Sequence, residues 1–154
     1  MKSILHQLKS ISQFILLFSL IFTSIHGTRG LIAELNDRNF DKTIKDDDRW
    51  VIQFYSKECK LCEKFRPHLE KLADLPEKEF GFLLKFGVVD INENPHLVSR
   101  FLATRVPQYY VIDKKRVYSF TAVQTYQYMF EFLKYRRWKL FPLREGLSDP
   151  FSKM

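Results

Sequence analysis

Trp50-Val-Ile-Gln-Phe-Tyr-Ser-Lys-Glu-Cys-Lys-Leu-Cys62 is the stretch that decides the fold of this chain. Its apolar first half predicts a buried strand, and a helical pattern follows the cysteines to about Asp74. The only two cysteines, Cys59 and Cys62, therefore stand at a strand-to-helix turn. The first N–H groups of a helix lack intrahelical partners and favour a thiolate there. The pattern predicts thiol–disulfide exchange, with Cys59 as nucleophile and Cys62 as resolving thiol.

The same pair could instead form a permanent structural disulfide, contribute to a zinc site or remain as inert thiols. A zinc site needs about four ligands, but the histidines are scattered at His6, His26, His68 and His96. A permanent bridge over so short a loop would stabilise the fold little by chain entropy. The spacing therefore favours redox chemistry, and we expect no cofactor and no metal.

The first 27 residues have the pattern of a secretory signal peptide. Lys2 and Lys9 precede and flank an apolar stretch, Phe14 to Phe22, and small or polar residues follow to Gly27. This stretch is shorter than the roughly 20 residues of a membrane span, so we expect a cleaved leader, with an uncleaved anchor as the alternative. A secretory route leads to an oxidising compartment, where a reactive dithiol meets disulfide substrates.

After the leader, strand and helix patterns alternate in the order βαβαβαββα. The strands are predicted at 31–35, 51–55, 85–91, 109–112 and 116–120. The helices are predicted at 39–45, from the cysteines to 74, at 95–102 and at 125–135. With 45% hydrophobic residues, the chain suits one compact α/β domain with extra segments at its ends.

Residues 54–62, Phe-Tyr-Ser-Lys-Glu-Cys-Lys-Leu-Cys, resemble the Phe-Tyr-Ala-Pro-Trp-Cys-Gly-His-Cys signature of protein disulfide isomerases. Pro67, Val89-Asp-Ile91 and Arg105-Val-Pro107 match further positions of that family in the same order. The resemblance implies a thioredoxin fold, in which helices flank a central mixed β-sheet. A weaker likeness of Trp138–Pro142 and 149–152 is to the segment after this domain in thioredoxin-related transmembrane proteins.

The leader pattern and this resemblance together divide the chain into a signal peptide (1–27), a thioredoxin-like domain (28–137) and a C-terminal tail (138–154). Together they imply residence in the endoplasmic reticulum lumen, or secretion. No stretch after residue 27 approaches the length of a membrane span. Membrane association would therefore need an uncleaved leader or an anchor missing from this chain.

The activity implied is that of a protein disulfide oxidoreductase or isomerase. Its partners would be client polypeptides of the secretory pathway that bear thiols or disulfides. The family also places a cis peptide before Pro107, which would expose the backbone of Val106 to pair with an extended client segment. Val106 and Pro107 are therefore the predicted substrate-binding residues.

Two departures from the family pattern bear on the nucleophile. Glu58 replaces the family's tryptophan, and its charge disfavours the thiolate of Cys59. Lys60 opposes this effect from the other side. Solvation of both side chains would leave neither with much influence.

Two further departures bear on resolution and reoxidation. Gln53 stands where the family carries a buried acid that helps to deprotonate the resolving cysteine, so Cys62 is expected to resolve slowly. Gln124 falls near the family's mobile arginine. These losses favour a second function class, a redox-impaired client-binding or chaperone module that uses the face around Pro107.

The chain has a net charge of +7. Part of this charge comes from basic residues near the C-terminus, which form a cluster with aromatic residues between them. Its members are Lys134, Tyr135, Arg136, Arg137, Trp138, Lys139, Phe141 and Arg144. Such a cluster can bind nucleic acid or an anionic membrane, but a secretory protein is not expected to meet nucleic acid. We expect instead a cationic helix end followed by an aromatic tail that packs on the domain.

Overall fold

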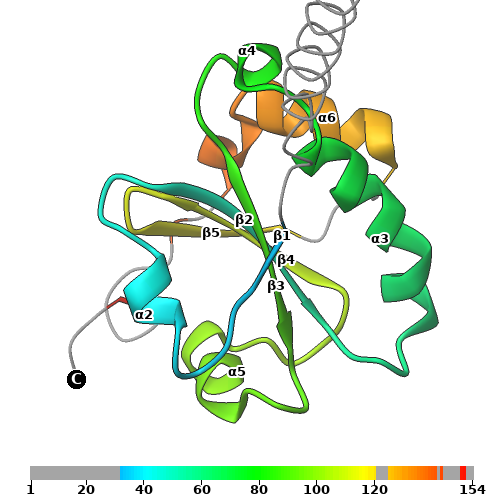
Figure 1. Cartoon of the computed structure of the whole chain (residues 1–154), viewed down its shortest axis with the longest axis vertical. Helices are drawn as coiled ribbons and strands as arrows, with labels where there is room; N and C mark the ends of the chain where they lie inside the picture. The colour runs from blue at the N-terminus through cyan, green and yellow to red at the C-terminus, as the bar shows by residue number, and fades with distance from the viewer. Residues whose placement is uncertain (1–31, 121–124, 142, 144–149, 152–154) are drawn as a thin grey trace, which may run out of the picture.

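The computed structural model describes residues 32–120, 125–141, 143 and 150–151. The predicted leader, Gln124 and Arg144 lie outside the described residues. Figure 1 shows the helices and strands in chain order. They are β1 (Ile32–Glu34), α2 (Phe40–Thr43), β2 (Arg49–Tyr55), α3 (Lys60–Ala73), α4 (Glu77–Phe80), β3 (Lys85–Asp90), α5 (Pro95–Phe101), β4 (Gln108–Asp113), β5 (Arg116–Phe120), α6 (Tyr126–Lys134) and the 3-10 helix η1 (Arg137–Leu140).

The strands form one mixed sheet in the order β1-β3-β2-β4-β5. β1, β3 and β2 run parallel, and β4 and β5 are antiparallel to their neighbours. The predicted α/β class and mixed sheet are confirmed, with α4 as an additional short helix. β2 occupies the centre of the sheet, so both of its faces are covered and its middle residues are buried.

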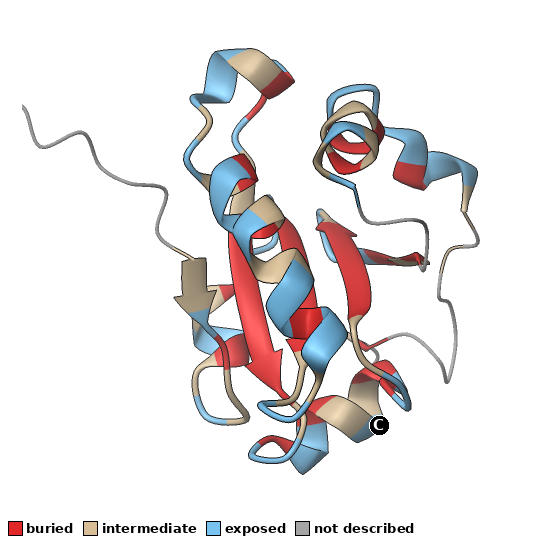
Figure 2. Ribbon diagram, turned by 90° about the vertical axis from the view of Figure 1, so that its right-hand side faces the viewer, coloured by how far each residue is buried: buried red, intermediate tan, exposed pale blue. Residues whose placement is uncertain are grey.

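Two hydrophobic cores lie on opposite faces of the sheet. Residues of α3, α6 and η1 pack with Val51 and Tyr109 on one face. Residues of α2 and α5 pack with Ile52 and Phe54 on the other face. Figure 2 shows the buried strands between partly exposed helices. The alternation along β2 follows from the two-residue period of a strand, and it turns Val51 and Gln53 toward α3.

Trp138 opens the segment predicted as a tail, yet its side chain is fully buried in the first core. Its ring centroid lies 5.8 Å from that of Phe82 and 6.4 Å from that of Phe132. Phe141 is half-buried and also contacts Phe132. Tyr135, in contrast, is 63% exposed. The packed aromatic tail is therefore confirmed for Trp138 and Phe141, whereas Tyr135 faces solvent.

No helix among the described residues combines the length and the apolar character that crossing a bilayer requires.

Candidate active site

The two cysteines lie where β2 gives way to α3. Cys59 is the N-cap residue of α3, and Cys62 lies in the first turn of this helix. They form a disulfide, with their Cα atoms 5.2 Å apart. The structure therefore joins the pair that the sequence singled out, at the strand-to-helix turn that the sequence predicted.

The two sulfur-bearing residues differ in exposure. Cys62 is only 4% exposed, whereas Cys59 is half-buried. The backbone N–H of Cys62 donates a hydrogen bond to Sγ of Cys59 at 3.1 Å. This N–H belongs to the first turn of the helix and has no intrahelical acceptor, so it would also stabilise a Cys59 thiolate after reduction. The outer cysteine can therefore meet another sulfur atom while the inner one is shielded.

The loop that carries Cys59 is tied to the loop after β3. Lys57 Nζ lies 2.5 Å from a carboxylate oxygen of Glu93 and 3.6 Å from one of Asp90. Asn92 Nδ2 donates a hydrogen bond of 3.1 Å to Glu58. Two successive side chains thus hold the loop that leads to Cys59, although both are exposed to solvent.

Glu58 is a negative charge beside Cys59 at neutral pH. A hydrogen bond from its own backbone N–H lowers the pKa of Glu58, and the side chain of Asn92 adds to this effect. Lys60, the predicted opposing charge, is exposed and forms no ion pair with the described part of the chain.

Replacing Glu58 by glutamine should favour the Cys59 thiolate. Glu58→Gln keeps an acceptor for Asn92 and removes the charge that opposes ionisation of Cys59, so the pKa of Cys59 should fall. Because the charge is exposed and screened, we expect the exchange rate near neutral pH to rise only about twofold. Thiolate absorbance of the reduced protein against pH measures the shift, with the exposed Glu70→Gln on α3 as control. A titration identical to that of the wild type would show that the Glu58 charge does not reach Cys59.

Gln53 forms a neutral pair beneath the face that α3 covers. Its side chain is fully buried, and Nε2 donates a hydrogen bond of 2.9 Å to the hydroxyl of Tyr109. Its Oε1 has no hydrogen-bond partner among the described residues. Burial raises the pKa of Tyr109 far above its usual value. Gln53 thus holds the position that the resemblance gives to a buried acid. Gln53 and its partner Tyr109 both stay neutral near pH 7.

The peptide bond between Val106 and Pro107 is cis, as the resemblance implied. Both residues are half-buried and directly precede β4. β4 runs antiparallel to β2, and Phe54 pairs with Gln108. The start of β4 therefore lies at the same end of the sheet as the end of β2, from which the chain continues to Cys59. The role of Val106 and Pro107 in binding a substrate stays a prediction.

A hollow of about 370 Å³ adjoins the disulfide. It is lined by 55–57, Cys59, Cys62, Glu63, Arg66 and Pro67. Arg66 is the residue that sequence reasoning missed, because a lone arginine on an amphipathic helix usually indicates a solvated face. Its guanidinium lies over the ring of Tyr55, with 4.6 Å from Cζ to the ring centroid.

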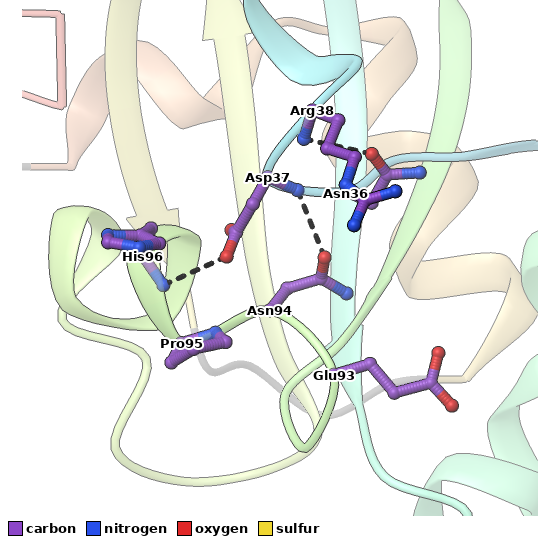
Figure 3. A pocket seen from close by; sticks show the side chains of 7 residues that line it. All are labelled: Asn36, Asp37, Arg38, Glu93, Asn94, Pro95 and His96. Carbon is purple, nitrogen blue, oxygen red and sulfur yellow. Dashed lines mark hydrogen bonds between the residues drawn. The ribbon is translucent and has the colours of Figure 1, made fainter.

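A second hollow, of about 660 Å³, lies between the loop 36–38 and the segment 93–96, which runs from a loop into the start of α5 (Figure 3). Here the backbone N–H groups of His96 and Leu97 donate to the carboxylate of Asp37, and the N–H of Asp37 donates to Asn94. These bonds cap α5 and join the two segments. His96 is exposed, and no metal-binding group of three His, Cys, Asp or Glu side chains occurs within the described ranges.

Comparison with known proteins agrees with this geometry. A family model described as thioredoxin matches residues 31–134. The chain is 26% identical over 114 residues to thioredoxin-related transmembrane protein 1 of Homo sapiens, a match that covers 74% of this chain and 39% of that protein. It is 29% identical over 84 residues to human protein disulfide-isomerase A6, which covers 54% of this chain and 19% of that protein. The matches thus span well under half of these relatives.

Solved structures show the same fold. The first thioredoxin domain of mouse protein disulfide-isomerase A4 gives a TM-score of 0.61 at 23% identity, over 70% of this chain and 75% of that one. A mutant thioredoxin of Halobacterium salinarum gives a TM-score of 0.60 at 17% identity, over 70% of this chain and 91% of that one. At these identities the structures support the architecture alone.

Proposed function

Because the chain belongs to the thioredoxin family, we propose that it is a thiol–disulfide oxidoreductase that acts on cysteines of secretory-pathway client proteins. One observation carries this proposal: Cys59 and Cys62 are joined at the start of α3 with one cysteine accessible and the other buried. The leader pattern of 1–27 and the likeness to protein disulfide-isomerases support action in the endoplasmic reticulum lumen or after secretion.

The reaction proceeds by two exchanges. In the reduced protein, the Cys59 thiolate attacks a client disulfide, and the second client sulfur leaves as a thiolate. Cys62 then loses its proton and attacks Sγ of Cys59, which releases the client thiol and forms the Cys59–Cys62 disulfide. The client has gained two electrons and this protein has lost two. The reverse sequence oxidises a client dithiol.

The second exchange needs a proton acceptor near Cys62. Gln53 cannot take up a proton near pH 7, and Tyr109, which accepts no proton near neutral pH even at its ordinary pKa, is protonated there; burial raises its pKa further. Proton loss from Cys62 therefore relies on solvent, on the substrate or on an exposed carboxylate such as Glu63, and not on a buried acid at position 53. We expect the resolving step to be slow compared with the attack by Cys59.

The neutral Gln53–Tyr109 pair also favours the second function class, a client-binding module with weak turnover. In this alternative, the face around Pro107 holds an extended client segment and the cysteines matter little. Val106 and Pro107 would then provide the binding site, as the sequence predicted.

A variant without both cysteines separates the two functions. With excess reduced glutathione as the electron donor that regenerates the dithiol, catalysis predicts that wild-type protein reduces more than one equivalent of a peptide probe with one disulfide. Cys59→Ala/Cys62→Ala should abolish this acceleration over glutathione alone. The binding module predicts that the double variant retains a reduced, unfolded client within about twofold of the wild-type affinity, because no covalent bond contributes. Probe turnover and client binding are measured on the same preparations, with the exposed Lys64→Ala of α3 as control. Absence of turnover together with unchanged binding would contradict the oxidoreductase proposal.

A further inference from the structure

The hollow beside the disulfide contains a cation, Arg66, that no carboxylate of the described residues neutralises. Arg66 makes no ion pair or hydrogen bond with another described residue. The other cation of the hollow, Lys57, is already neutralised by Glu93 and by Asp90. The available positive charge in the hollow is therefore that of Arg66.

The placement of Arg66 leaves its donors free. Tyr55 covers one face of the guanidinium, at 4.6 Å from Cζ to the ring centroid. Stacking uses the face of this planar group, whereas its N–H donors lie in the plane and match the two oxygens of a carboxylate. The ring also restricts the side chain, which reduces the entropy that binding would cost.

Arg66 and the disulfide line the same hollow, with Arg66 about one helical turn beyond Cys62. Arg66 follows Cys62 by four positions in α3, and side chains four apart on a helix are neighbours, with about 5–6 Å between Cβ atoms. Cys59, Cys62 and Arg66 line the same hollow. A molecule that brings its sulfur to Cys59 can therefore present a nearby carboxylate to Arg66.

We propose that Arg66 binds a carboxylate carried close to the reacting sulfur, so that the site prefers thiols and disulfides bearing an acidic group. This preference rests on the proposed exchange function and adds a substrate class to it. The carboxylate can belong to a small thiol acid or to an acidic residue beside a client cysteine. Glu63, an exposed carboxylate of the same hollow, opposes the preference by repulsion.

The covalent step is the reduction of the protein disulfide by a thiol. A substrate thiolate attacks Sγ of Cys59, the Cys59–Cys62 bond breaks, and Cys62 leaves as a thiolate that is then protonated. A second substrate thiolate attacks the substrate sulfur of this mixed disulfide and releases the Cys59 thiolate. The substrate becomes its disulfide and the protein pair becomes a dithiol, so two electrons pass to the protein.

Three small thiols of similar size test the proposal on the full chain. Mercaptopropionate carries a carboxylate, mercaptoethanol is neutral and cysteamine is cationic. The rate at which each reduces the Cys59–Cys62 pair is followed by alkylation and mass spectrometry. We expect Arg66→Gln to lower the ratio of the mercaptopropionate rate to the mercaptoethanol rate by about threefold to tenfold, less at high salt. Taking this ratio within each variant cancels the intrinsic difference between the thiols.

Two further charge-removing variants separate the effect of Arg66 from that of other charges near the disulfide. Lys60→Gln removes an equal charge next to Cys59 but outside the hollow lining, so its ratio should stay within about twofold of the wild-type value. Glu63→Gln should raise the ratio, because it removes the opposing charge. An unchanged ratio in Arg66→Gln, with exchange intact, would overturn the carboxylate site and leave the proposed function standing. If none of the three thiols reduced the Cys59–Cys62 disulfide of the wild type, the proposed exchange function itself would be contradicted.

Two peptide substrates, each with one disulfide, identify the source of the carboxylate, and the rate at which the reduced protein reduces each of them is measured. They differ only in an aspartate or an asparagine beside the cysteine. If Arg66→Gln also removes the preference for the aspartate peptide, the site serves acidic protein clients. If it changes the small-thiol ratio alone, the site serves small thiol acids.

Discussion

A Cys62→Ala variant is expected to accumulate covalent adducts with its clients, whereas a Cys59→Ala variant is not. Cys59 is the accessible cysteine and Cys62 the buried one, so Cys59 makes the bond to the client and Cys62 releases it. Without Cys62, release depends on outside thiols. We expect the adducts to change from a minor species in the wild type to the main form of the variant.

The adducts are trapped by rapid alkylation of cells and separated without reductant. They should disappear when reductant is added, and Cys59→Ala/Cys62→Ala should show none. Adducts of Cys59→Ala equal to those of Cys62→Ala would contradict the assignment of the two roles. If neither single variant formed adducts, the protein would not exchange disulfides with clients.

Trp138→Ala should lower the free energy of unfolding by about 3–5 kcal/mol, the range observed when a large buried aromatic side chain is removed. The Trp138 ring is fully buried against Phe82 and Phe132. Its Nε1 has no hydrogen-bond partner among the described residues, so the loss is one of packing and of the cavity left behind. The loss would show that the folded unit continues past residue 137.

Leu140→Ala provides the matched control. Leu140 lies two positions further in η1 and is 83% exposed, so its truncation should change the free energy of unfolding by less than about 0.5 kcal/mol. Urea denaturation of the oxidised proteins, followed by circular dichroism, compares the two variants. A loss below about 1 kcal/mol for Trp138→Ala would mean that the ring is not part of the cooperative core.

Local pattern was sufficient to predict most elements of the fold. A run of apolar residues predicted a strand at 51–55, and the structure extends it backward to Arg49. That extension depends on a distant partner, since Arg49 pairs with Asp113 of β4 at 2.8 Å. α4 was missed because a four-residue helix is too short to show a period. It lies between Pro76 and Gly81, whose φ of 74° suits glycine as a helix stop.

The features of the candidate site also fall into two groups: those that local sequence or the family resemblance predicted, and those that depend on contacts between distant residues. The position of the cysteine pair was predictable because its spacing is local, and the cis bond before Pro107 came with the family resemblance. The Gln53–Tyr109 hydrogen bond joins residues 56 positions apart, and only the β2–β4 pairing brings them together. The role proposed for Arg66 likewise depends on a contact that the sequence does not show, the stacking of its guanidinium on Tyr55 at the end of β2.

The two tryptophans of the chain are divided between the faces of the sheet. Trp50 belongs to the core beneath α2 and α5, and Trp138 to the core beneath α3 and α6. Neither lines the hollow beside the disulfide. Intrinsic fluorescence can therefore report on each packing layer through its own fluorophore, with Trp50→Phe and Trp138→Phe isolating one signal at a time.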